Sequence, residues 1–538
     1  MQFSRLSIGR TGLLALSLGV APAHALETLY MGDDTTIDAS VTLSYTASAR
    51  TSSPSNVYLN DPNYDDGTRN FDRGSLINNR LTALGEVRIR HDNVGALVRG
   101  SVFYDDVYRR SNDNDSPATV NKIGAADQFT DLARERSGHD PRLLDAFAYG
   151  NWVLGDNNYL SVKAGRHIVA WGESLFWPNI SQGQLPVDAA VFNVPGTEAK
   201  EAYLPVGQLS ASLTLTDNLT LTGFYQYDWE ETRLNPVGDF FGSDTFGPGA
   251  QFIRFGAGAI DSLPNAGVIS YAGEIEPDNS GQWGIGARYL LGDSTELGLF
   301  HYRYHDRVGA LLTDFTGDTR YSSFSAFDGC SDGVSGCYQL AYFDNIKLTG
   351  ASISSKVGDV QLGGDISYRD GAPVYLDNRA PTRGSYLQTN VNTVYIIGPS
   401  ALAHQTTLLA EVVHQRIQDV DTLTITSGGA SSSSDTFEYD GQTRNNTALA
   451  VAAFMDYPAI FSGWDLTTKA IWTQNIDGSG FSGMGRDEKR MTLGADVKYL
   501  GNMQIGLTYV GYLSSANLAK GRTLADRDYV SLSAKYSF

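Results

Sequence analysis

The side chains with the most potential for chemistry are acids, bases and histidines that recur at every second position. In an extended strand such residues share one face, so they would line a common polar surface. Charges of both signs on that surface could select a solute, or they could pair with one another and stabilise it. Their mixed signs indicate no preference for anions or cations. The candidates are Glu86, Arg88, Arg99, His301, Arg303, His305, Asp365 and Arg369.

The histidines form no recognisable metal or catalytic motif. His301 and His305 would lie about 13 Å apart on a strand, which is too far for two ligands of one ion. The stretch Gly172-Glu173-Ser174 lacks the glycine that follows the serine of a nucleophile elbow. We therefore predict no metal, no cofactor and no catalytic residues. A lipase or protease remains an alternative, because a catalytic triad can be assembled from distant positions.

The chain contains two cysteines, Cys330 and Cys337, in a stretch rich in Gly, Ser and Asp. In an exported protein such a pair is typical of a disulfide that closes a small loop. We predict that bond, since no further metal or redox ligands are close in the sequence.

Alternation of apolar and polar residues predicts the elements that carry these side chains. It recurs along the whole chain, for example in residues 37–45, 219–230 and 490–499, and it is typical of strands with one apolar face. Short Gly, Asn and Asp turns alternate with long irregular segments, as in barrels of the bacterial outer membrane. The last strand, residues 529–538, ends on Phe538 in its apolar phase. We predict an all-β, transmembrane antiparallel up-and-down β-barrel of about 18 strands, or else about 16, with both termini on the periplasmic side.

The N-terminus and the composition indicate export. Arg5 and Arg10 precede an apolar stretch at residues 12–21 and the small-residue site Ala23-His24-Ala25, so residues 1–25 are predicted to be a cleaved secretory signal peptide. Residues 26–538 then form the barrel domain, in the cell outer membrane of a Gram-negative bacterium. No later apolar stretch is long enough to span a membrane as a helix. A formal net charge of −20 argues against nucleic acid as a partner.

One segment, residues 165–207, breaks the alternation. Its prolines exclude a central strand, yet it is rich in large apolar side chains that a fully solvated loop would not expose. We predict a bulge or inward bend at Gly165-Arg166, followed by a segment that folds into the barrel and plugs or narrows it. The alternative is a compact surface loop packed on its neighbours. The candidate constriction residues are Arg166, Trp171, Glu173, Phe176, Trp177 and Asp188.

Several motifs resemble the proteobacterial outer-membrane family catalogued as domain of unknown function 1302. They are Trp171-Gly172-Glu173-Ser174 and residues 66–74, 143–147, 186–189, 195–196, 201–206, 367–373 and 526–538. The resemblance covers essentially the whole mature chain. It implies a barrel that belongs to a system moving lipids, steroids or similar compounds, often with a second exported protein and an inner-membrane exporter. It carries over no catalytic residues.

These features favour an outer-membrane channel or transport component for hydrophobic or amphipathic small molecules of lipid- or steroid-like kind, because the predicted plug is aromatic and the wall polar. A structural or surface-interaction barrel whose long loops bind a partner is a second alternative beside the enzyme. The expected partners are membrane lipid and lipopolysaccharide, and the barrel-assembly machinery, which would act on the strand ending at Phe538. The resemblance adds a periplasmic protein and an inner-membrane exporter.

Overall fold

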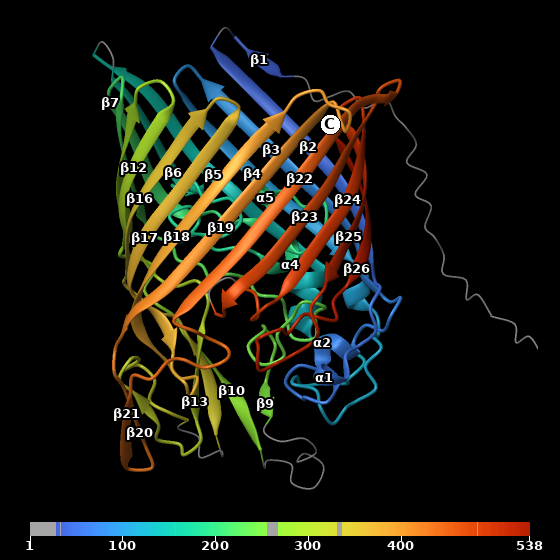
Figure 1. The fold of residues 1–538 in the computed structure, drawn as a ribbon, viewed down its shortest axis with the longest axis vertical. Helices are drawn as coiled ribbons and strands as arrows, with labels where there is room; N and C mark the ends of the chain where they lie inside the picture. The colour runs from blue at the N-terminus through green and yellow to red at the C-terminus, as the bar shows by residue number, and fades with distance from the viewer. Residues whose placement is uncertain (1–27, 33, 156–157, 255–266, 331–335, 481–482) are drawn as a thin grey trace, which may run out of the picture.

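The computed structural model describes residues 28–32, 34–155, 158–254, 267–330, 336–480 and 483–538. The predicted signal peptide lies outside the described residues. The chain forms a closed antiparallel barrel of 18 strands in which successive strands are neighbours (Figure 1). The predicted fold class and strand number are therefore confirmed.

The wall strands run alternately toward the two ends of the barrel and are joined by short turns at one end. They are β2 (Thr35–Arg50), β3 (Leu76–His91), β4 (Val94–Asp105), β5 (His139–Leu154), β6 (Asn158–His167), β7 (Val206–Thr216), β8 (Leu219–Gln226), β11 (Gln282–Leu291), β12 (Thr295–Tyr304), β16 (Ile346–Val357), β17 (Val360–Tyr375), β18 (Pro381–Ile397), β19 (Gln405–Val420), β22 (Asn445–Phe461), β23 (Trp464–Gly478), β24 (Lys489–Tyr499), β25 (Met503–Tyr512) and β26 (Tyr529–Ser537). A short strand, β1 (Leu29–Met31), pairs with the start of β2.

The barrel closes where its last strand meets its first. β26 pairs antiparallel with β2, from Arg50 opposite Tyr529 to Thr42 opposite Ser537. Side chains of the closing strand alternate: Leu532 is 50% exposed on the outer face, whereas Ser531 is 1% exposed inside. Closure leaves no edge strand in the wall, so the backbone groups of the wall are paired within it.

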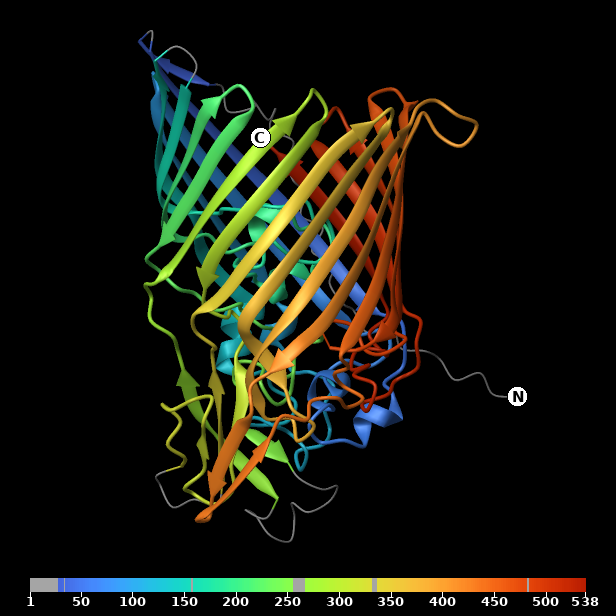
Figure 2. The same ribbon diagram turned by 60° about the vertical axis from the view of Figure 1, so that its left-hand side comes forward.

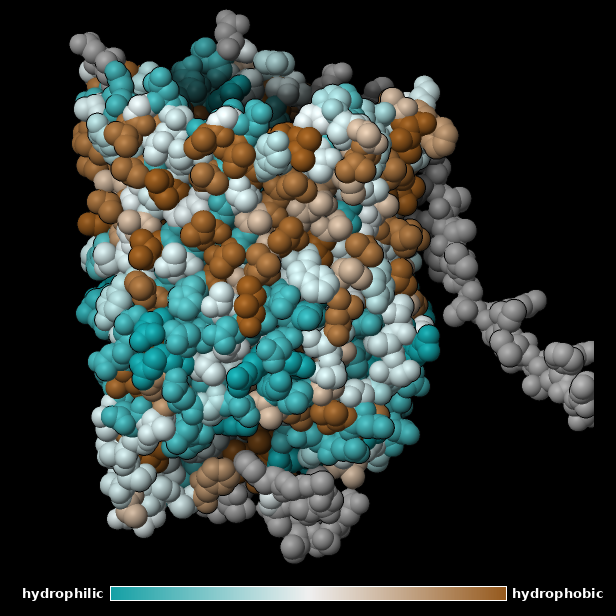
Figure 3. All heavy atoms as spheres, in the orientation of Figure 1, coloured by the Kyte–Doolittle hydropathy of each residue, from teal (hydrophilic) through white to brown (hydrophobic). Residues whose placement is uncertain are grey.

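The outer face of the wall is apolar over the half of the barrel that carries the short turns. Along β17, Leu362, Ile366 and Tyr368 are exposed, whereas Gly363, Asp365 and Ser367, on the opposite face, are buried. Figure 3 shows brown, apolar side chains on the upper half of the wall and a teal, polar band below them. An apolar band of this kind is the surface that a bilayer requires.

The long loops fold into a cap at the other end (Figures 1 and 2). Two small sheets belong to it: β13 (Ala310–Asp314), β15 (Cys337–Ala341), β10 (Val268–Ile275) and β9 (Phe252–Arg254), and β14 (Arg320–Tyr321), β20 (Leu423–Ser427) and β21 (Ala430–Ser434). The cap also contains short helices, α1 (Asn56–Leu59), α2 (Asp66–Arg69), η1 (Val107–Arg109), α3 (Asp131–Ala133) and η2 (Arg134–Gly138). None of the helices in the described ranges is long and apolar enough to cross a membrane.

The cap has aromatic cores of its own. The ring of Phe240 lies 5.4 Å from that of Phe71 and 6.3 Å from that of Tyr529 on the closing strand. The predicted disulfide between Cys330 and Cys337 is confirmed, with Cα atoms 5.9 Å apart. Loops that are far apart in the sequence thus pack on one another and on the end of the closing seam.

A charge on the apolar outer face should destabilise the barrel. Val391 on β18 is 59% exposed and pairs with Val412. We expect Val391→Arg to lower the free energy of unfolding by about 2–4 kcal/mol, the cost of an arginine at the bilayer midplane. The measurement is urea unfolding of the protein in lipid vesicles.

Leu402→Arg is the matched control, because Leu402 is 73% exposed in a short turn. This control should change the free energy of unfolding by no more than about 0.5 kcal/mol. Equal effects of the two substitutions would contradict a lipid-facing position for Val391.

Candidate functional site

The segment between β6 and β7 leaves the wall and lies inside the barrel. His167 still pairs with Val206, so residues 168–205, hereafter the plug, form the excursion. The plug contains α4 (Ala189–Phe192) and α5 (Ala199–Ala202), which Figure 1 shows within the ring of wall strands. The predicted bulge at Gly165-Arg166 is wrong, because β6 stays in register with β5 through Arg166 and with β7 through His167. The predicted inward bend lies just beyond it, after His167.

The plug crosses the lumen, because it is bonded to wall strands far apart around the ring. Glu198 forms an ion pair with Lys535 on β26 at 2.8 Å, and the Thr46 hydroxyl on β2 donates to the carbonyl oxygen of Pro195. At its other side the plug is bonded to β17, β18 and β19. Between these strands lie several others on either side of the ring.

Two wall carboxylates hold the backbone of the plug. Asp365 on β17 accepts hydrogen bonds from the backbone N–H groups of Glu173 and Ser174, at 3.0 and 3.1 Å. Glu411 on β19 accepts from those of Leu175 and Phe176. Both carboxylates are 1% exposed. Charge-assisted bonds of this kind are stronger than bonds between neutral groups, so these four amides fix the plug firmly to the wall.

Amide side chains of β18 continue the attachment. Asn392 donates to the carbonyl oxygen of Glu173 at 2.7 Å, Asn390 to that of Trp177 at 3.0 Å, and Gln388 to that of Pro178 at 2.8 Å. The plug makes no ladder with the wall here, so its backbone groups need other partners. The wall side chains supply those partners.

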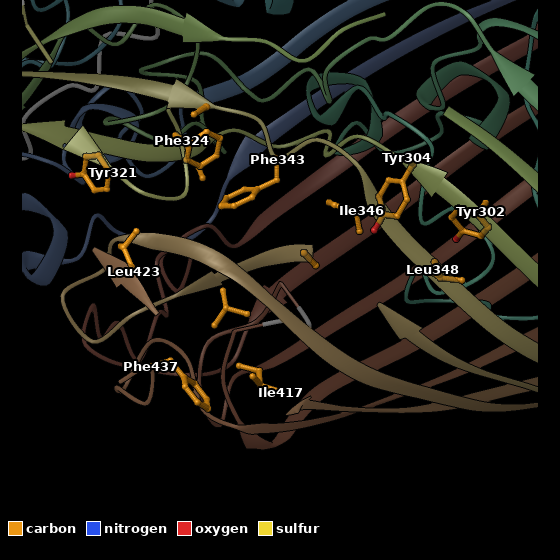
Figure 4. Close-up of a cluster of buried hydrophobic side chains, with 14 of the residues drawn as sticks. Tyr302, Tyr304, Tyr321, Phe324, Phe343, Ile346, Leu348, Ile417, Leu423 and Phe437 are labelled. Carbon is orange, nitrogen blue, oxygen red and sulfur yellow. The ribbon is translucent and has the colours of Figure 1, made fainter. Parts of the chain in front are cut away.

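The opposite face of this part of the plug is aromatic. Trp171 is 5% exposed, and its ring lies 5.4 Å from that of Phe300 and 5.1 Å from that of Phe224. Tyr302 is fully buried, and its hydroxyl donates to the carbonyl oxygens of Asn179 and Ile180. Tyr302 and Trp171 belong to one cluster of buried apolar side chains. Figure 4 shows how this cluster continues from Tyr302 toward the cap.

The prediction that His301 and Arg303 face the lumen is wrong. Phe300 and Tyr302 on β12 are buried at 3% and 0% exposure, whereas Leu299 is 65% exposed. The alternate residues, His301 and Arg303, therefore lie on the outer face with Leu299. The inner face of β12 is apolar here because it packs against Trp171. The polar residues of this part of the strand therefore face outward, which reverses the usual arrangement of a barrel wall.

Two further candidates lie elsewhere than expected. Arg166 shares the outer face of β6 with Ala164, which pairs with the exposed Leu209; it forms ion pairs with Asp228 and Glu230. It is not part of a constriction, because the chain turns inward only after His167.

His305 follows the end of β12 and is 2% exposed. Its Nδ1 accepts from the backbone N–H of Asn345 at 3.0 Å, and its Nε2 lies 3.0 Å from the carbonyl oxygen of Ser280. It is packed in loops and does not line the lumen.

The remaining lumen candidates face inward and are paired. Arg99 bridges Glu86 and Asp145 at 2.6 Å each, and Arg88 lies 3.4 Å from Glu86. Arg369 donates to the carbonyl oxygen of Asn179 in the plug and to Gln388 of the wall. These side chains pair with one another and stabilise the interior, which is the second of the two roles considered for them. Asp365 and Arg369 are in addition covered by the plug.

The plug candidates have different roles. Asp188 is 1% exposed; it accepts from the backbone N–H of Val191 as the N-cap of α4 and pairs with Arg142 of β5 at 2.7 Å. Phe176 and Trp177 are half-buried, with ring centroids 6.2 Å apart. Asp188 thus fixes the plug to the wall, whereas the Phe176–Trp177 pair keeps accessible apolar surface.

No catalytic triad is assembled around the one histidine bonded to a serine side chain in the described chain. His167 Nε2 lies 2.7 Å from Ser210 Oγ, but its Nδ1 faces the carbonyl oxygen of Gly165 where a triad requires a carboxylate. Within the described ranges, no group of three or more His, Cys, Asp or Glu residues could hold a metal ion.

Sequence reasoning missed four wall side chains that hold the plug, Glu411, Gln388, Asn390 and Asn392. A signal for them is present. Gln388, Asn390 and Asn392 are three amide side chains at alternate positions, so they share one face of the strand. A wall that only contacts water does not require three such amides together. Glu411 is an acidic residue flanked by Ala410 and Val412 in an otherwise apolar stretch.

The sequence matches the family described as "Protein of unknown function (DUF1302)" over residues 8–538, and the chain belongs to this family. Comparison with curated proteins gave no match. Similar solved structures include Acinetobacter baumannii OccAB1, with a TM-score of 0.44, 10% identity, and coverage of 93% of this chain and 96% of that one. For a BenF-like porin from Pseudomonas fluorescens Pf-5 the values are 0.40, 12%, 93% and 98%. For Pseudomonas aeruginosa OccK2 (OpdF) in complex with glucuronate they are 0.40, 11%, 93% and 98%.

Loss of one anchoring charge should loosen the plug locally. We expect Glu411→Gln to speed hydrogen exchange of the Leu175 and Phe176 amides by about ten- to a hundredfold, because a hydrogen bond to a charged group contributes about 1.5–3 kcal/mol. Hydrogen exchange read by mass spectrometry on the protein in detergent measures this.

Asp496→Asn is the control, since Asp496 pairs with Lys469 of the wall and has no bond to the plug. Exchange in residues 173–177 should be unchanged in that variant. Unchanged exchange in Glu411→Gln as well would show that this carboxylate does not hold the plug.

Proposed function

We propose that this member of the DUF1302 family is an outer-membrane channel or transport component for hydrophobic or amphipathic small molecules, and that the plug gates it. The observation that carries the proposal is the plug itself, which crosses the lumen and is bonded to β26 at one side and to β17, β18 and β19 at the other. A structural barrel has no need of such a segment.

The way the plug is attached supports gating. Its hydrogen bonds with β17, β18 and β19 are made by wall side chains, whereas the wall strands β6 and β7 remain paired with each other at His167 and Val206. The plug can therefore move without breaking a wall ladder. Wall ladders, by contrast, have to stay intact in a bilayer.

The accessible surface of the plug supports the substrate class. Leu175 is 42% exposed and Phe192 is 61% exposed, although both belong to the segment inside the barrel. The wall at the level of Arg99 and Glu86 is charged. A passage bounded by apolar side chains on one part and paired charges on another suits a molecule with an apolar body and a polar end.

The apolar belt and the closing strand support an outer-membrane location, because only closed barrels and helices satisfy their backbone groups within a bilayer. Lipopolysaccharide and lipid would then contact the belt. The barrel-assembly machinery would act on β26, and a periplasmic protein and an inner-membrane exporter would complete the system. These partners are inferred from the family resemblance and from the fold.

Removal of the plug should open the barrel. Deleting residues 172–204 leaves the β6–β7 pairing in place, so we expect the variant to fold and to show a several-fold higher single-channel conductance in planar bilayers. Unchanged conductance in a folded variant would rule out the plug as a gate.

A cross-linked variant provides the control for movement. Glu198→Cys with Lys535→Cys places two thiols where the structure has an ion pair, and a short bismaleimide would tie the plug to β26. Flux of a steroid into proteoliposomes should fall on cross-linking, whereas a sugar of similar size should not enter either form. Equal flux of both solutes would contradict the proposed substrate class.

A further inference from the structure

Part of the inner wall is aromatic where β5 and β6 run from the short turns toward the plug. Val98 on β4 is 51% exposed on the outer face and pairs with Ala146 of β5. The residues that alternate with Ala146, Phe147 and Tyr149, therefore point inward. Lys163 on β6 lies directly opposite Tyr149 and shares its face. We call Phe147, Tyr149 and Lys163 the lumen patch.

The two rings of the lumen patch lie against the wall and keep accessible surface. The Lys163 ammonium lies 5.5 Å from the centre of the Phe147 ring. The Tyr149 ring occupies the space beside Gly95 of β4, where a Cβ atom would approach it to 2.5 Å. Both rings are half-buried, so each offers apolar surface to a solute in the lumen.

The apolar surface continues toward the short turns. Val153 and Tyr159 pair with each other across β5 and β6 and lie on the same inner face as the lumen patch. They are 61% and 59% exposed. A wall that only contacts water does not need a contiguous group of large apolar side chains, and such groups mark binding surfaces.

The positive charge of Lys163 is not neutralised. Its side chain is exposed, and among the described residues no carboxylate forms an ion pair with it. Two other inward lysines differ in this respect. Lys469 pairs with Asp496 at 3.1 Å, and Lys535 pairs with Glu198 at 2.8 Å. Contact with an exposed aromatic ring contributes about 0.5–1 kcal/mol and leaves the charge in place.

The acids nearest to the lumen patch are already engaged. Glu86 and Asp145 both bind Arg99, at 2.6 Å each. Arg90 of β3 lies opposite Gly95, in the same row as Tyr149 and Lys163, and forms no ion pair within the described ranges. Positive charge is therefore in excess on the inner faces of β2 to β6 between the turns and the plug. The inward cations here are Arg88, Arg90, Arg99 and Lys163, and the inward acids are Asp38, Glu86 and Asp145.

We propose that the lumen patch binds an amphipathic anion, a carboxylate carried on an apolar ring, with the carboxylate beside Lys163 and the ring against Phe147 and Tyr149. The inference rests on the proposed function, since a site on the inner wall serves a solute that enters the barrel. It adds the sign of the polar end of that solute. Arg90, about three strand spacings or roughly 14 Å away along the wall, attracts the same anion toward the site.

Calorimetric titration of the protein in lipid nanodiscs with 3-phenylpropionate tests the proposal, with empty nanodiscs as the background. The probes of matched shape are 3-phenylpropanol, which is neutral, and 3-phenylpropylamine, which is positive. We expect 3-phenylpropionate to bind and the amine to bind at least about tenfold more weakly. Lys163→Gln should weaken 3-phenylpropionate by about tenfold, the effect of losing a charged partner. Lys163→Arg keeps the charge and should stay within about threefold of the parent protein.

Lys469→Gln is the matched control, because Lys469 is also an inward lysine but is neutralised by Asp496. It should leave the binding of 3-phenylpropionate within a factor of about two. Equal binding of the amine, equal effects of the two glutamine substitutions, or no binding of 3-phenylpropionate would each overturn the proposal. Binding requires no movement of the plug, so this titration and the conductance of the plug deletion can fail independently of each other.

Discussion

Every backbone N–H and C=O in this protein needs a partner inside the chain wherever water is absent, and that constraint organises both the wall and the plug. In the wall the partners are neighbouring strands, and the ring is complete only because β26 meets β2. The alternating side chains follow from this geometry, with Leu532 outside and Ser531 inside on the same strand. The fold is thus a consequence of hydrogen bonding first and of side-chain sorting second.

In the plug the same constraint has a different solution. Residues 173–177 of the plug form no ladder with the wall, so wall side chains bond their backbone: Asp365 and Glu411 for N–H groups, and the amides Asn390 and Asn392 for carbonyls. The inward-facing side chains of β17, β18 and β19 therefore determine where the plug lies. The aromatic patch of β8 and β12 around Trp171 holds its other face.

The fold was largely predictable from the sequence, because alternation and turn composition are local signals. The strand number, the closing pair and the inward segment follow from them. The faces of β12 were not predictable in this way: His301 and Tyr302 both fit a two-residue period, and only contact with Trp171 decides which of them turns inward. The carboxylate Glu411 and the aromatic contacts of Phe240 depend on segments hundreds of residues away, which no local pattern reports.

The ion pair between Lys535 and Glu198 joins the last strand to a segment that precedes it by 337 residues. Near it, the seam hydroxyls of Thr42 and Ser537 are separated by 495 residues. Both contacts are made by β26, so the same strand that seals the ring also completes the attachment of the plug on that side. A change at the end of this strand would therefore be felt both in the wall and in the interior of the barrel.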